Sequence, residues 1–280
     1  MLDLKLDRAA AAPKDAATLI LVRDSASGVE VFCVERNKKS RFLGGAIVFP
    51  GGKLDAKDAD ASWLDLVTPP RPTTFANDDA HLRALAIAAC RESLEEAAIL
   101  PITGTVADAE LHALRKEMES DPEALARFLR ARGLRLDLAA LHPFGRWITP
   151  EAESRRFDAR FFVAIAPEGQ TAVHDEHETT ASFWARPAEV LRRFAEDEVQ
   201  LAPPTHRILA LLAERKDAKD VLALAAGSNL APICPRLVPQ GDTMALVLPG
   251  DPEHEVKESR VPGSSRYVLR GERWRSENAP

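Results

Sequence analysis

The chain has 280 residues, and its 37 Lys and Arg residues against 43 Asp and Glu residues give a net charge of -6. This balance provides no broad basic surface, which argues against nucleic acid as a partner. Three cysteines form no metal-binding spacing, and their odd number argues against a disulfide framework. Without a signal-peptide pattern or a long uncharged apolar run, we expect a cytoplasmic protein with no membrane partner.

The first elements predicted along the chain are short strands. Apolar runs at 17–23 and 29–36 flank a turn-forming segment at 24–28. Val, Ile and Phe favour strands while Asp, Ser and Gly favour turns, so the pattern predicts a β-hairpin. A third strand is expected at 46–49, where the glycines and proline at 50–52 end it.

A polar segment and two helical regions come next. The segment 53–79 is expected to be an irregular insertion because it is polar and contains three prolines. The strongest helix pattern, at 81–98, has leucines and alanines at helical spacing and no helix breaker. A second helical region at 106–132 is interrupted where Asp121 is expected to cap a new helix and Pro122 to begin it.

The remaining patterns complete an α/β fold with a mixed β-sheet between helices and a helical insertion. Strand patterns lie at 144–148, 160–166 and 181–185, helix patterns at 187–196 and 204–215, and weaker strand patterns at 244–248 and 266–270. We expect a flexible N-terminus at 1–16 and one domain at 17–230, with insertions at about 53–79 and 102–140. The C-terminal extension, 231–280, is expected to pack on that domain.

The residues that indicate chemistry are three glutamates on the predicted helix at 81–98. In Arg91-Glu92-Ser93-Leu94-Glu95-Glu96, Glu92 lies about one turn from both Glu95 and Glu96, so three carboxylates share one face. Carboxylate oxygens are the ligands that hard divalent cations such as Mg²⁺ or Mn²⁺ prefer. Taken alone, this pattern is more often a solvated acidic surface, so its context decides.

That context is a strand that ends in a glycine turn. Gly51 and Gly52 follow the strand at 46–49, and glycine permits both a tight turn and close approach of the backbone to a ligand. A strand, a glycine turn and a helix with R-E-x-x-E-E together resemble the Nudix box, G-x5-E-x7-R-E-U-x-E-E-x-G-U. Gly52 and Arg91 are 39 positions apart, far more than in the box as written, so an insertion separates the turn from the helix.

Further segments resemble one branch of the Nudix superfamily. AACRESLEEAAIL, FGRWITPEAESRRFDARFF and LAPPTHRILALL occur here in the order found in the branch that contains the peroxisomal coenzyme A diphosphatase of mammals. The resemblance covers about 17–212 and implies a Nudix-type sheet between helices. It also implies a metal-dependent pyrophosphohydrolase that cleaves coenzyme A or acyl-CoA into 3′,5′-ADP and a 4′-phosphopantetheine product.

Two alternatives stay open. The chain could be a Nudix hydrolase of another small-molecule nucleoside diphosphate, such as ADP-ribose, a dinucleotide or a nucleotide sugar. It could also be a Nudix fold that binds a nucleotide as a sensor without cleaving it, although a pure binder has no need of three clustered carboxylates. Whether the chain forms a homodimer is not readable from the sequence.

The resemblance assigns roles to the residues of the helix motif. Glu92 and Glu96 are the expected primary ligands of Mg²⁺ or Mn²⁺, and Glu95 is a further ligand or positions the attacking water. Arg91 stays protonated and cannot be a base, so its implied role is to orient a carboxylate through paired hydrogen bonds. An additional base is sought in the acidic turn before 181–185, at Glu176 or Glu178, with a plain surface turn as the alternative.

Candidate substrate-binding residues follow from the charge of a diphosphate. They are Gly51 and Gly52 of the turn and three arginines, Arg36, Arg155 and Arg156, whose guanidinium groups fit phosphate oxygens.

Two positions depart from the box. Asp58 stands where the first box glutamate would fall if the ordinary spacing held, but the insertion makes that alignment unsafe, so we expect Asp58 to cap or solvate the insertion. Ala98 replaces the glycine that follows the helix. This predicts either a different helix ending or a strain of roughly 1 kcal/mol.

Overall fold

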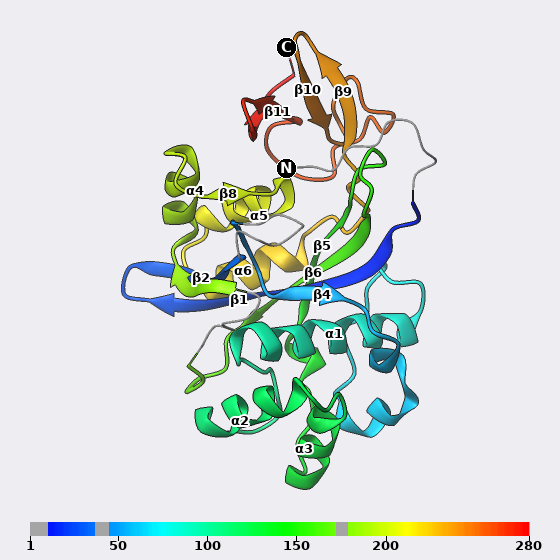
Figure 1. Cartoon of the computed structure of the whole chain (residues 1–280), viewed down its shortest axis with the longest axis vertical. Coiled ribbons are helices and arrows are strands. Elements are labelled where there is room, and N and C mark those ends of the chain that lie inside the picture. The colour runs from blue at the N-terminus through cyan, green and yellow to red at the C-terminus, as the bar shows by residue number, and fades with distance from the viewer. Residues whose placement is uncertain (1–10, 37–44, 172–178, 280) are drawn as a thin grey trace.

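The computed structural model describes residues 11–36, 45–171 and 179–279, which form a central mixed sheet with helices on both faces (Figure 1). The strands are β1 (Lys14–Ser25), β2 (Gly28–Arg36), β3 (Ala46–Val48), β4 (Gly51–Lys53), β5 (His142–Ile148), β6 (Phe157–Ile165), β7 (Thr179–Ala185) and β8 (Gln200–Leu201). Their order is β5-β6-β1-β2-β3-β8, with β4 paired to β1 and β7 to β2. The β1–β6 and β3–β8 pairs are parallel and the others antiparallel, so the expected mixed sheet is confirmed.

The predicted β1–β2 hairpin is present, and both faces of β1 are buried. Ser25 pairs with Gly28 at the turn. Side chains alternate along a strand, so Leu19 and Leu21 enter one hydrophobic cluster while Ile20 and Val22 enter another on the opposite face. Burial on both faces explains why this strand is a continuous apolar run rather than an alternating one.

The helices form two layers on either side of the sheet. They are α1 (Asp79–Ala97), α2 (Asp108–Met118), α3 (Ala124–Arg132), α4 (Pro187–Ala195), α5 (Pro203–Ala213) and α6 (Ala218–Ala226). In Figure 1, α1, α2 and α3 cover one face, whereas α4, α5 and α6 lie on the other. Asp78 caps the start of α1, because its carboxylate accepts a hydrogen bond from the backbone N–H of His81 at 2.8 Å.

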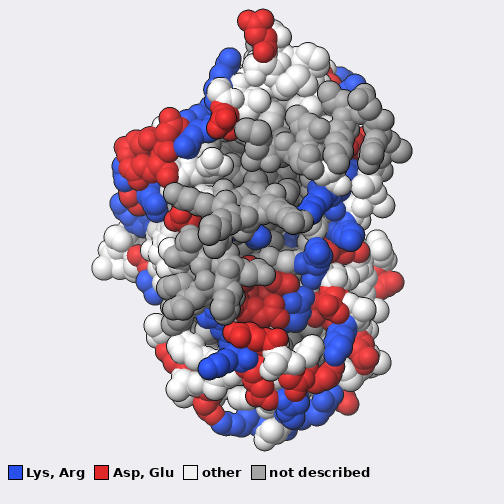
Figure 2. All heavy atoms as spheres, viewed as in Figure 1, with Lys and Arg blue, Asp and Glu red and all other residues white. Residues whose placement is uncertain are grey.

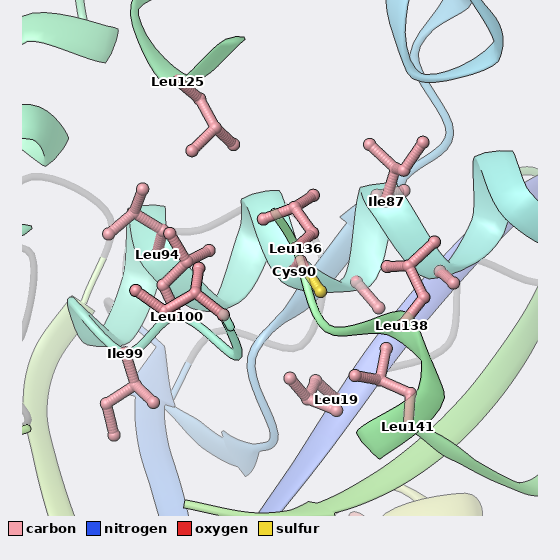
Figure 3. Packing of buried hydrophobic residues seen from close by; sticks show 14 of the residues in the cluster. Leu19, Ile87, Cys90, Leu94, Ile99, Leu100, Leu125, Leu136, Leu138 and Leu141 are labelled. Carbon is pink, nitrogen blue, oxygen red and sulfur yellow. The ribbon is translucent and has the colours of Figure 1, made fainter. Parts of the chain in front are cut away.

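The inserted helices pack on the outer side of α1 and bury it (Figure 3). Leu111 of α2 and Leu125 of α3 belong to the same cluster as Leu94 of α1 and Leu19 of the sheet. Because α1 is covered on both sides, most of its circumference is apolar. Cys90 is fully buried in this cluster, and burial raises the pKa of its thiol, which fits a packed small residue rather than a nucleophile.

Several local expectations need correction. The segment 53–79 is not irregular throughout, since it contains two 3₁₀ helices, η1 (Ala56–Ala59) and η2 (Ala61–Leu66). The helix α3 begins at Ala124 and not at Pro122, because Asp121 caps a preceding turn by accepting the N–H of Glu123 at 2.9 Å. Helix α6 and strand β8 were not expected. Residues 14–16 lie in β1 and so are not part of a flexible terminus.

The C-terminal extension forms a second sheet. Its strands are β9 (Arg236–Gln240), β10 (Thr243–Val247), β11 (Arg266–Arg270) and β12 (Arg273–Glu277), antiparallel in the order β12-β11-β10-β9. Four strands stand where the sequence predicted two. Leu246, Leu248 and Tyr267 bury their side chains in the same cluster as α4, α5 and α6. The boundary expected at residue 230 stays a prediction.

Within the described residues, no helix is long and apolar enough to cross a membrane.

Candidate active site

The turn predicted at Gly51 and Gly52 lies one residue earlier, because the bend is at Pro50 and both glycines belong to strand β4. This segment, still called the glycine turn below, lies directly against the glutamate helix. Strand β4 pairs with β1 on one side and packs on α1 on the other. A Cβ atom added at Gly51 would stand 2.7 Å from the carbonyl oxygen of Ala17, and one added at Gly52 would stand 2.3 Å from Oε1 of Glu92. Both distances are below any normal contact. At Gly51 the neighbouring atoms include the backbone of β1, so this approach of the two strands requires glycine, whereas a side chain at Gly52 would displace the carboxyl group of Glu92.

The three glutamates of α1 differ in environment. Glu96 is buried, and its Oε2 accepts a hydrogen bond from the backbone N–H of Gly51 at 3.0 Å. The side chain of Glu92 is 15% exposed and that of Glu95 is 38% exposed. The three carboxylates therefore differ in exposure, from Glu96, which the backbone of Gly51 holds, to Glu95, which is open to the solvent.

Arg91 ties this cluster to the insertion. Its Nε and Nη2 donate to the two carboxylate oxygens of Asp58 at 3.0 Å each. Its Nη1 donates to Glu92 at 2.8 Å and to Glu95 at 3.1 Å, and its Nη2 also reaches the carbonyl oxygen of Lys53 at 3.0 Å. These ion pairs raise the pKa of Arg91 against the opposing effect of burial, so it remains a cation that orients carboxylates.

Asp58 is the site residue that the sequence reasoning set aside. Besides the paired hydrogen bonds with Arg91, its carboxylate accepts the N–H of Asp55, the capping residue of η1, at 2.8 Å and so completes the capping box of that helix. It is only 2% exposed. The signal that could have found it is its spacing from Gly52, which matches G-x5-E of the box although Asp58 lies within the segment 53–79 that was expected to be an insertion.

Burial shifts the ionisation of Glu92. Burial raises the pKa of Glu92 to about 7; Arg91 opposes this shift and the charge of Glu95 adds to it. A carboxylate in this environment gains from a nearby cation beyond Arg91. The oxygen donors suit a hard divalent ion, and Gly52 leaves no side chain in the way.

Within the described ranges, no three His, Cys, Asp or Glu side chains converge closely enough to hold an ion. The contacts of Glu96 with Gly51 and of Glu92 with Arg91 indicate why. The donor set therefore fits a divalent metal in its chemistry, and a bound ion requires these carboxylates to turn towards it.

The glutamates lie in a cleft of about 920 Å³, near the upper end of the range for ligand sites. Its lining comes from β1, the end of β2, β3, β4, α1, α2, parts of β5 and β6, α4, β8, the start of α5, and the C-terminal sheet. Figure 2 shows acidic and basic side chains side by side across the middle of this face of the molecule. Arg115 of the inserted helix α2 also lines the cleft, a position that the sequence did not indicate.

The structure brings two of the three predicted arginines to the cleft. Arg36 and Arg155 line it, and the buried Nε of Arg36 has no hydrogen-bond partner among the described residues. Arg156 is instead buried outside the cleft lining, where it donates to the carbonyl oxygens of Thr149 at 3.0 Å and Ala11 at 2.9 Å. Its contacts are those of a structural arginine. The candidate bases Glu176 and Glu178 lie outside the described residues.

Comparison with known proteins agrees with this geometry. The family model described as the NUDT19 Nudix domain matches residues 9–211. A relative from Gallus gallus, named acyl-coenzyme A diphosphatase NUDT19, is 28% identical over 272 residues, covering 79% of this chain and 72% of the relative. The protein of the same name from Homo sapiens is 29% identical over 271 residues, covering 81% and 72%.

A solved structure is also similar. The crystal structure of a Nudix hydrolase from Alicyclobacillus acidocaldarius has a TM-score of 0.67 and 32% identity, covering 76% of this chain and 96% of that one.

The fold and the glycine-turn and glutamate-helix site together define a Nudix hydrolase, which confirms the expected fold and enzyme class. More narrowly, the chain belongs to the NUDT19 Nudix domain family.

Proposed function

We propose that this enzyme hydrolyses the diphosphate of coenzyme A and its acyl thioesters, in a reaction that depends on Mg²⁺ or Mn²⁺. Water adds to one phosphorus atom, the P–O–P bridge breaks, and the products are 3′,5′-ADP and 4′-phosphopantetheine or its acyl form. The observation that carries the proposal is the cluster of Glu92, Glu95 and Glu96 at a glycine turn, in a chain whose curated relatives are named acyl-coenzyme A diphosphatases.

Glu92, Glu95 and Glu96 are the residues that would hold the metal. A divalent ion there supplies neutralisation of the diphosphate charge and a more acidic bound water. Arg91 keeps Glu92 and Glu95 in place through Nη1, while its fork to Asp58 fixes the guanidinium itself. This support makes Asp58 and Arg91 positioning residues.

Phosphate binding falls to the glycine turn and to the cleft cations. Gly51 and Gly52 line the cleft, and the backbone of Gly52 lies beside the carboxyl group of Glu92, where a phosphate would be held. Arg36, Arg155 and Arg115 line the same cleft, and a substrate with a diphosphate and a 3′-phosphate carries enough charge to engage several guanidinium groups. The unpartnered Nε of Arg36 makes it the first of these to test.

The test is a substrate panel. Purified protein with Mg²⁺ or Mn²⁺ is given coenzyme A, acetyl-CoA, ADP-ribose, NADH and diadenosine polyphosphates, and the products are resolved by mass. We expect preferential formation of 3′,5′-ADP from the coenzyme A compounds. Preference for another diphosphate would reject the substrate assignment, and absence of turnover in folded, metal-bound protein would favour a nucleotide sensor.

Glu95→Gln and Glu96→Gln test the metal cluster. Each removes a charge without changing shape, and we expect kcat to fall about 1,000-fold, as when a main electrostatic contact of a transition state is lost. Glu117→Gln is the matched control, because Glu117 of α2 pairs with Arg127 and does not line the cleft. A variant of Glu96 with normal kcat would remove this residue from the site. A cytoplasmic location and a homodimer stay predictions.

A further inference from the structure

The C-terminal sheet forms part of the cleft, although the family match ends at residue 211. Trp274 of β12, Leu246 of β10 and Pro235 line the cleft together with the aromatic residues Phe161 and Phe194. Trp274 is half-buried and packs against the hydrophobic cluster that lies between the sheet and α4–α6. This apolar part of the cleft, made by β10, the β11–β12 hairpin, β6 and α4, is called the apolar wall below.

The hairpin is fixed to the Nudix domain by the two arginines beside the tryptophan. Arg273 donates to the carbonyl oxygens of Val199 at 2.7 Å and Asp197 at 2.6 Å. Arg275 donates to the carbonyl oxygen of Phe194 at 3.1 Å and pairs with the carboxylate of Asp197. Because Arg273 and Arg275 are both fixed to the Nudix domain, Trp274 between them is held in a defined place.

The charges of the lining differ from one part of the cleft to another. Arg273 is the cation that the apolar wall contributes, and its Nε, Nη1 and Nη2 all contact Asp197 or Val199. Arg91 pairs with Asp58. The remaining arginines of the lining are Arg36 of β2, Arg115 of α2 and Arg155 of the loop before β6. Three lining arginines therefore lie outside the apolar wall. Within the wall, Arg273 holds the hairpin to the segment that follows α4.

We propose that the C-terminal hairpin binds the uncharged arm of the substrate, the pantetheine chain with its acyl group, and that Trp274 determines specificity for that arm. The proposal rests on the proposed coenzyme A diphosphatase function. An indole ring suits this arm because its face packs on an alkyl chain and its N–H can donate to an amide carbonyl. The cationic side of the cleft is then left to the phosphates of the nucleotide.

The experiment compares the two halves of the substrate in one variant. For wild-type protein and Trp274→Ala, we would measure kcat and KM with coenzyme A and octanoyl-CoA, and the inhibition constants of 3′,5′-ADP and 4′-phosphopantetheine. We expect KM for octanoyl-CoA to rise about 10-fold, the scale of one lost apolar contact in a pocket. The inhibition constant of 4′-phosphopantetheine should rise with it, while that of 3′,5′-ADP and kcat stay within twofold.

Three variants separate binding from folding. Trp274→Phe keeps an aromatic face and should recover most of the octanoyl-CoA affinity. If Trp274→Ala does not fold, Trp274→Phe still allows the two inhibition constants to be compared with those of the wild-type protein. Trp184→Ala is the matched control, since Trp184 of β7 is half-buried against Phe32 and is not a lining residue. It should lower the melting temperature and leave both inhibition constants unchanged.

Two results would overturn the proposal. A weaker constant for 3′,5′-ADP with an unchanged one for 4′-phosphopantetheine would assign the hairpin to the nucleotide. Unchanged constants for both products would leave the hairpin with no part in binding. Failure of the proposed function is distinct, because wild-type protein would then cleave another diphosphate in preference before any variant is made.

Discussion

Two buried Arg–Asp pairs in this molecule have the same geometry and different neighbours. Arg91 grips Asp58 and Arg266 grips Asp251, in each case through Nε and Nη2 to both carboxylate oxygens at 2.7 to 3.0 Å. The aspartates are 2% and 0% exposed. The arginines differ, since the side chain of Arg91 is 18% exposed and that of Arg266 is 1% exposed, but the hydrogen-bond geometry to the aspartate does not distinguish the two sites.

The difference lies in the remaining donor of each guanidinium. Nη1 of Arg91 reaches Glu92 and Glu95 in the cleft, whereas Nη1 of Arg266 reaches Gln240 at 3.0 Å and Glu253 at 2.9 Å. The first pair therefore connects the folded insertion to the carboxylates of the site. The second closes the long connection between β10 and β11 on its own sheet. A buried Arg–Asp pair indicates function only through what its third donor touches.

The largest expected effect is on the pair in the cleft. Asp58→Asn removes one charge of the fork, so Arg91 is free to shift away from Glu92 and Glu95. We expect kcat to fall about 10- to 100-fold, as when a residue that orients metal ligands is lost. We also expect a loss of about 3 kcal/mol in the free energy of unfolding, because a buried pair is broken. Steady-state kinetics and urea unfolding measure the two effects, and Asp58→Glu, which restores the charge, should recover most of kcat.

The matching change in the C-terminal sheet should affect stability alone. Asp251→Asn leaves Arg266 buried with half its charge compensation and removes the acceptor of the Ser265 hydroxyl at 2.6 Å. Burial raises the pKa of Asp251, but hydrogen bonds from Arg266, Ser265 and the N–H of Glu253 outweigh it and hold the pKa below its usual range.

For Asp251→Asn we expect a loss of about 3 kcal/mol in the free energy of unfolding and an unchanged kcat at temperatures well below the transition. A fall in kcat equal to that of Asp58→Asn would contradict the distinction between the two pairs.

A smaller effect concerns the contact between α5 and the C-terminal sheet. His206 of α5 lies 3.1 Å from the hydroxyl of Tyr267 and stacks near Phe194. Burial lowers the pKa of His206 to about 4, and the charges of Arg207 and Arg275 add to this shift. Between the ordinary value of about 6.5 and the folded value, the unfolded chain binds the proton and the folded chain does not, so stability falls as the pH falls.

We expect that, between pH 7 and pH 4.5, His206 accounts for a loss of about 2 kcal/mol, reduced from the full shift because the ring is only partly buried. His206→Gln keeps a polar partner for Tyr267 without titrating. Urea unfolding of both proteins at the two pH values gives the difference, and equal pH dependence in the two would rule out this role.

Local patterns predicted one part of the site and the fold, and distant contacts formed the rest. The glycine turn and R-E-x-x-E-E are contiguous motifs, and the β1–β2 hairpin follows from two apolar runs around a turn. The role of Asp58 could not be predicted, because its partner Arg91 lies 33 positions further along the chain, beyond the rest of the insertion. The strands β9 and β12 escaped because arginines and a proline hide any alternation. Arg273 and Arg275 gain their partners from the end of α4 and the segment that follows it, more than 70 positions upstream.

The smallest effect expected is at the end of α1. Ala98 has φ 55° and ψ 27°, the left-handed conformation that glycine usually takes, and its N–H closes the helix on the carbonyl oxygen of Leu94 at 3.0 Å. The strain that the sequence predicted is therefore present. For alanine it amounts to about 1 to 2 kcal/mol.

Ala98→Gly should nevertheless change the free energy of unfolding by less than about 1 kcal/mol. The substitution relieves the strain, but it removes a methyl group that is 1% exposed, which costs about 0.8 kcal/mol. Glycine also raises the conformational entropy of the unfolded chain, which lowers the free energy of unfolding by a further 0.4 to 1 kcal/mol or so, about the size of the methyl term. Ala98→Val keeps the strain and adds a β-branch, so it should lose about 2 kcal/mol. Thermal unfolding of both variants measures this, and a gain above about 2 kcal/mol for glycine would mean that the buried methyl group contributes nothing.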